Sequence, residues 1–198
     1  MRTRVVLALF SITLSTSVAA QSALQAQADA AWAKLQAVML TAGPPTRPPA
    51  ASRRTIFSQA EMNAYLRYRA GTWLPAGLTE PSVQFIGANR IATLVTADLD
   101  GVRKKSAGGW FDPTTYLSGR LPVYVTGTLS TASGRGRFVL EQATVDGVPV
   151  PRLFIDELLA FYTRSADNPA GVRLDEPFEL PSEIERIDVA AGQATVVQ

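Results

Sequence analysis

Residues 121–145, LPVYVTGTLSTASGRGRFVLEQATV, decide the fold, because they predict two strands joined by a hairpin. Apolar and polar residues alternate over 121–130, which is the period of a strand with one buried face. Ser133-Gly134 supplies the turn, and residues 137–145 form the return strand. An antiparallel sheet is therefore the expected centre of the protein.

Further short elements are expected on both sides of this hairpin. Residues 81–99 alternate in the same way around a turn at Ala88-Asn89, and so predict two strands. The remaining expectations are a helical turn over 114–117 after Asp112-Pro113, a break in the sheet at 147–151 (GVPVP), and strands over 172–180 and 184–197 with a turn at Gly192.

Two helices flank the predicted strands in the sequence. The first begins at Ser58, where Glu61 three residues later completes a capping box, and it runs to about Ala70. The second, residues 152–164, is apolar around most of its surface, so we expect it to be enclosed by core or by ligand. A parallel α/β fold would need a helix after nearly every strand. The order therefore predicts an α+β domain with a curved antiparallel sheet.

The N-terminal region predicts export. Residues 1–20 combine an early positive charge, a short apolar run and small residues before a cleavage site after about Ala20, which is the pattern of a signal peptide. We therefore expect a periplasmic protein with no transmembrane span after cleavage. Residues 21–52 predict a helical arm over 22–40 and a proline-rich linker, and residues 53–198 form the compact domain.

The composition excludes several classes of function. The chain has 19 basic and 17 acidic residues, and removing Arg2 and Arg4 with the signal peptide leaves a neutral protein. A neutral surface argues against nucleic acid as a partner. The sequence has no histidine and no cysteine, which excludes serine–histidine and cysteine–histidine catalysis and thiolate metal sites. We expect no metal and no cofactor.

One pair of carboxylates keeps an enzymatic alternative open. Asp98 and Asp100 stand at i and i+2 at a predicted strand end, where they could hold a cation or act as an acid. A solvated strand end leading into a basic loop explains the same pattern more simply. We therefore expect no catalytic residue, and a hydrolase that uses this pair is the enzymatic alternative.

Large apolar side chains are the more informative feature. Core packing accounts for most of them, but a curved sheet against a very apolar helix can also enclose a ligand cavity. The candidate residues for such a groove are Tyr65, Leu66, Trp73, Phe154, Leu158, Phe161 and Tyr162.

Four short segments carry a resemblance to a known group. They are FSQAEMNAYL at 57–66, LPVYVTG at 121–127, GVPVP at 147–151, and the spaced apolar pattern from Ile184 to Gly192. Together they resemble small exported bacterial proteins of the tubular lipid-binding (TULIP-like) superfamily. The resemblance covers about residues 55–198. It implies a long curved sheet wrapped around a helix, with a groove for a lipid, and it implies no catalytic residues because that superfamily binds and shuttles.

Two functions from different classes are thus expected. The first is a non-catalytic lipid-binding or lipid-transfer protein of the cell envelope, which holds an apolar molecule between sheet and helices. The alternative is an envelope scaffold or assembly protein with a dry core, which docks on a partner protein through residues 22–40.

Overall fold

The computed structural model describes residues 6–40, 52–100, 118–166 and 168–198, with side chains from residue 21 onward. The helical turn expected over 114–117 lies outside the described residues. The elements, in chain order, are α1 (Val6–Leu40), β1 (Arg54–Ser58), α2 (Gln59–Tyr68), the 3-10 helix η1 (Ala70–Thr72), β2 (Leu78–Gly87), β3 (Arg90–Asp98), β4 (Arg120–Ala132), β5 (Arg135–Val145), β6 (Val148–Pro149), α4 (Arg152–Thr163), β7 (Phe178–Glu179), β8 (Arg186–Ala190) and β9 (Gln193–Val197).

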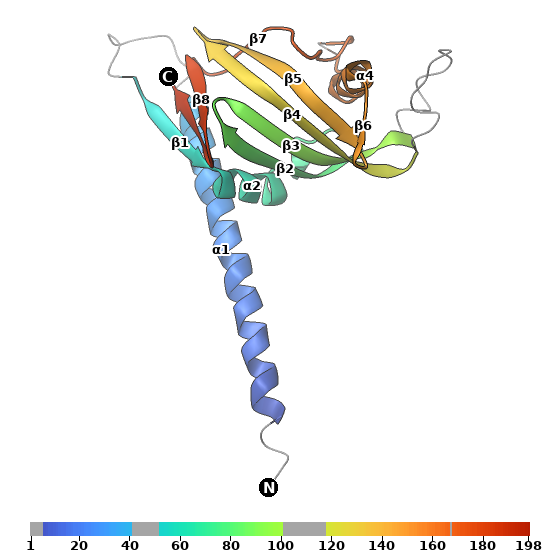
Figure 1. Ribbon diagram of the computed structural model, residues 1–198. Coiled ribbons are helices and arrows are strands. Elements are labelled where there is room, and N and C mark those ends of the chain that lie inside the picture. Colours follow the sequence, from blue (N-terminus) through green and yellow to red (C-terminus); the bar gives the residue numbers. More distant parts are fainter. Residues whose placement is uncertain (1–5, 41–51, 101–117, 167) are drawn as a thin grey trace.

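The fold is α+β, as the sequence predicts, and its largest part is a curved antiparallel sheet (Figure 1). Its strands follow the order β2-β3-β4-β5-β6, with β7 pairing beside β5, so the sheet stays open. The predicted hairpin turn is confirmed: Ser133 and Gly134 both have positive φ, as a tight turn between twisted strands requires. A register shift between Thr126 and Gly127 adds local curvature.

One face of this sheet is mainly apolar, and two different elements cover its ends. Paired residues such as Thr93, Val125 and Ala143 share this face. Helix α4 packs on one end, where Phe154 and Leu158 are buried. The second sheet, β1-β9-β8, packs on the other end through Val189 and its neighbours. Figure 1 shows α4 and β8 at opposite ends of the strands.

The second sheet contains a strand that the sequence did not reveal. Strand β1 pairs along its length with β9 at the end of the chain, and β9 also pairs with β8. The turn predicted at Gly192 is confirmed between these last two strands. The prediction of a strand over 172–180 is wrong except for β7, because the Leu174 and Val172 amides donate to side chains of α4. Residues 147–151 do not break the sheet at once, since β6 still pairs with β5.

Helix α2 closes the free edge of the large sheet at β2. The predicted capping box is present: the Glu61 amide donates to Ser58 Oγ at 3.2 Å, and the Ser58 amide donates to the Glu61 carboxylate at 2.9 Å. One turn later, the Asn63 side chain donates to the Val83 carbonyl and accepts from the Val83 amide, both at 2.8 Å. Asn63 thus takes the place of a neighbouring strand, and such cover suppresses edge-to-edge pairing.

Helix α1, which we expected to stand apart as an arm, packs on the domain over its second half. Ala28 and Ala31 are fully buried, and Val38 joins an apolar cluster with Phe57. Lys34 binds the Glu61 carboxylate at 2.7 Å. Burial raises the pKa of Glu61, but the hydrogen bonds from Lys34 and Ser58 and the Lys34 charge outweigh this and lower it.

The first half of α1 extends away from the domain (Figure 1). Residues 21–26 are exposed on this extension. Among the described residues, no helix combines the length and the apolar character needed to cross a bilayer. Cleavage after about Ala20 and export stay predictions.

Candidate functional site

A cavity of about 410 Å³ lies between α4 and the apolar face of the large sheet. We name it the apolar trough. It is lined by Pro75, Leu78, Thr93, Val95, Ala97, Val123, Val125, Phe138, Ile155, Leu158, Leu159, Tyr162, Thr163 and Leu174. Its volume falls within the range of about 300–1,000 Å³ that is typical of small-molecule sites.

The floor of the trough is the middle of the sheet, between its two covered ends. Thr93, Val95 and Val125 share this stretch, and Thr93 remains exposed because neither α4 nor the second sheet covers it. Phe138 lies across β4 at Gly127, where an added Cβ would stand 2.4 Å from its ring. The glycine therefore lets the aromatic ring lie close to the sheet and form one wall.

A segment after α4 fixes the helix over the sheet from one side. The Leu174 amide donates to Asp156 Oδ1 at 3.0 Å, and the Val172 amide donates to Thr163 Oγ1 at 2.7 Å. Arg152 also forms an ion pair with Asp175. These bonds explain why residues 172–175 follow the helix and do not join the sheet, and they place Leu174 in the wall of the trough.

Tyr162 fixes the helix from the other side. Its hydroxyl donates to the Asp98 carbonyl at 2.6 Å, which joins the last turn of α4 to the end of β3. Burial, together with the negative charge of Asp98, raises the pKa of Tyr162, so the hydroxyl remains a neutral donor at physiological pH. The helix is held at both sides, and the trough is therefore preformed.

The lining offers almost no polar chemistry. Its hydroxyls belong to Thr93, Thr163 and Tyr162. Thr163 Oγ1 already donates to the Leu159 carbonyl at 2.6 Å and accepts from Val172, and Tyr162 is bonded to Asp98. Of these three lining residues, only Thr93 has a hydroxyl that can hydrogen-bond to a ligand without losing a bond shown above. Binding in the trough would therefore depend on removing apolar surface from water.

The structure brings some of the predicted groove residues together on α4. Leu158 and Tyr162 line the trough. Phe154 is buried in the core beside it, at 2 % exposure. Phe161 is partly buried against the same core and makes an edge contact with the Tyr162 ring at 5.1 Å between centroids.

The other three predicted groove residues lie elsewhere. Tyr65 stacks on Trp32 of α1 with 6.1 Å between ring centroids, and so joins the two helices. Leu66 lines a different cavity between α2 and β2. Trp73 is 70 % exposed after η1.

Sequence reasoning missed the sheet side of the trough. Val95, Val125 and Phe138 supply it, together with Leu174. The alternation in the predicted strands was a usable signal for the two valines, because it places Val95 and Val125 on the buried face.

The carboxylate pair has a structural role at the end of β3. Asp98 Oδ1 accepts from the Asp100 amide, and Asp100 Oδ1 accepts from the Gly119 amide, both at 3.1 Å. Each carboxylate thus binds backbone that turns out of the sheet. Within the described residues, no group of three acidic, histidine or cysteine side chains is arranged to hold a metal ion.

Comparison with protein-family models finds none that matches the chain, and comparison with curated proteins finds no match either. The likeness to the TULIP-like superfamily thus rests on the four sequence segments alone and stays a prediction.

Proposed function

We propose that the protein binds a lipid or another apolar small molecule in the apolar trough and carries it through the periplasm without changing it. The observation that carries this proposal is a preformed cavity of about 410 Å³ whose lining is apolar except for three hydroxyls. Apolar chains leave water with a gain of about 0.8 kcal/mol for each buried CH₂. No acid, base or metal is required for such transfer.

The position of the trough supports binding over simple core packing. The middle of the sheet, which forms part of the floor of the trough, includes Thr93, and Thr93 is exposed on an otherwise apolar face. Protein cores pack with few voids larger than a water molecule. An apolar cavity of this size is therefore better explained by a guest than by imperfect packing.

The experiment is native mass spectrometry of the full chain, purified without denaturant, together with titration of a fluorescent apolar dye. We expect the spectrum to show either an apolar molecule released from the protein or an empty protein. An empty protein should take up the dye. A protein that is always empty and binds no dye would refute lipid binding.

A second candidate function is an envelope scaffold that docks through α1. The exposed residues 21–26 on the extended half of the helix favour it, because a partner could contact them without disturbing the domain. The test is capture of partners by the intact chain and by a variant lacking only 21–26, which spares the buried Ala28 and Ala31. Loss of all partners on deletion, with an empty trough, would favour this function.

A further inference from the structure

A second cavity, of about 630 Å³, lies at the β2 edge beside the apolar trough. We name it the polar hollow. Its walls come from α2, from the loop after η1 and from residues 78–82 of β2. Leu78 lines both cavities. The two cavities therefore adjoin at Leu78.

The shape of β2 opens this hollow. A register shift between Thr79 and Ser82 interrupts the pairing with β3. Pro81 lies within the shifted segment and has no N–H to pair. The hydroxyl side chains of Thr79 and Ser82 thus line the hollow at a place where the sheet edge is irregular.

The charged residues that line the hollow are one arginine, Arg67, and one glutamate, Glu80. Arg67 belongs to α2, and its guanidinium lies 5.9 Å from the centroid of the Tyr68 ring and forms no ion pair with a carboxylate of the described residues. A second guanidinium, that of Arg120, is outside the lining and donates to Thr79 Oγ1 at 2.6 Å. The one acidic residue of the lining, Glu80, accepts from Thr96 Oγ1 of β3 at 3.2 Å.

We infer that the ligand is a single-chain amphiphile whose alkyl chain occupies the apolar trough and whose phosphate head group binds Arg67 in the polar hollow. This inference rests on the proposed function. At about 30 Å³ for each carbon, close to the volume of one water molecule, the trough accommodates about a dozen methylenes. That is one chain and not two. A guanidinium binds phosphate oxygens in a forked arrangement that a neutral head group cannot match.

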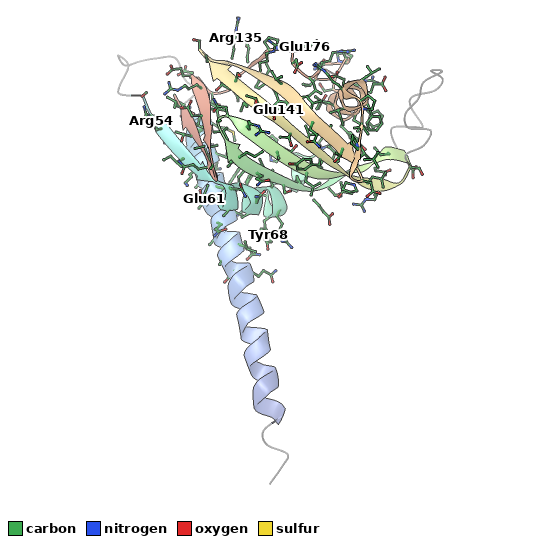
Figure 2. All side chains as sticks on the ribbon, in the orientation of Figure 1. Arg54, Glu61, Tyr68, Arg135, Glu141 and Glu176 are labelled. Atoms are coloured by element: carbon green, nitrogen blue, oxygen red, sulfur yellow. The ribbon has the colours of Figure 1, made fainter. Side chains whose placement is uncertain are left out.

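The test measures binding of decyl phosphate and of 1-decanol by displacement of an apolar dye from the full chain. The variants are Arg67→Gln, Arg67→Lys and, as a matched loss of charge, Arg135→Gln. Arg135 lies at the opposite edge of the domain from Tyr68, the neighbour of Arg67 (Figure 2). Both arginines are exposed, so folding is expected to survive, and thermal unfolding checks it.

We expect decyl phosphate to bind Arg67→Gln about fivefold more weakly than the natural chain, because exposed charge pairs contribute modestly. Arg67→Lys should bind decyl phosphate with an affinity between those of the natural chain and Arg67→Gln, because lysine keeps the charge but not the forked geometry. Decanol should bind all variants equally. Equal binding of decyl phosphate to the natural chain and Arg67→Gln, or an equal effect of Arg135→Gln, would overturn the head-group site while the trough stands. If neither ligand binds any variant, the proposed function itself fails.

Discussion

Filling the trough from its floor should weaken binding by about a hundredfold without unfolding the protein. Thr93 is exposed on the apolar face of the sheet and lines the trough, so Thr93→Trp places an indole ring in the space we assign to the ligand. Such a ring excludes about four methylenes of a bound chain, and at about 0.8 kcal/mol each the loss is about 3 kcal/mol. This corresponds to roughly hundredfold weaker binding.

Stability separates this effect from damage to the fold. An aromatic side chain that fills an apolar cavity commonly stabilises a protein by about 0.5–2 kcal/mol. We therefore expect Thr93→Trp to unfold at the same temperature as the natural chain or a higher one, while dye binding is weakened. The control is Gln142→Trp, which adds the same ring at an exposed position on β5 that does not line the trough.

The assay is titration of a fluorescent apolar dye, with thermal unfolding followed by circular dichroism. Binding that is unchanged in Thr93→Trp would refute the trough as the site. Equal loss in Thr93→Trp and Gln142→Trp would also refute the reasoning, because the effect would then not depend on the cavity.

Three further predictions concern the contacts that hold the site in place. Glu61→Gln should cost about 1 kcal/mol at pH 7, because Lys34 loses a charged partner that is partly buried. The pKa of Glu61 is lowered by folding, so this stability is present above its ordinary value of 4.5 and is lost as the pH falls through the lowered value; urea unfolding should show the variant and the natural chain converging in acid. Asn63→Ala should cost about 1–3 kcal/mol in the same assay, since the amide and carbonyl of Val83 lose their partner, and an unchanged midpoint would contradict the edge role of Asn63. Tyr162→Phe should cost about 1 kcal/mol but leave dye affinity within about twofold, because the hydroxyl bonds Asp98 and not the guest; a large loss of affinity would show that the hydroxyl contacts the ligand.

Local signals in the sequence were sufficient for much of the fold. The turn at Ser133-Gly134 and the capping box of Ser58 and Glu61 each depend on residues close in sequence, and both are present in the structure. The apolar character of residues 152–164 predicted a helix enclosed by core or by ligand, and α4 packs with sheet residues in an apolar core. In each case the residues that form the sequence pattern are the same few residues whose interactions determine the local structure.

The features that sequence reasoning missed depend on distant partners. Strand β1 has only five residues and is paired by β9 at the other end of the chain, so nothing beside it in sequence marks it as a strand. Residues 172–175 alternate like a strand, but Asp156 and Thr163 of α4 bind their amides. The helix α1 was expected to be free because a proline-rich linker follows it, and no local pattern shows that Val38 meets Phe57.

The sequence predicted the type of candidate site, an apolar space between sheet and helix, but only some of the residues that line it. An apolar space between sheet and helix follows from the composition of α4, and Leu158 and Tyr162 line it. Tyr65 does not, because it stacks on Trp32 of α1, and Trp73 is exposed. Size and aromatic character alone do not tell which side chains meet, since the relative placement of elements decides it.

The most direct test of the central claim is to observe where an apolar guest contacts the protein. Intermolecular nuclear Overhauser effects between 1-decanol and methyl groups of the folded chain supply this. We predict contacts to the methyls of Val95, Val125 and Leu158, which line the trough, and none to Val139, which is exposed at 39 % and does not line it. Contacts to Val139 in preference to the lining methyls, or no contacts at saturating decanol, would contradict the account.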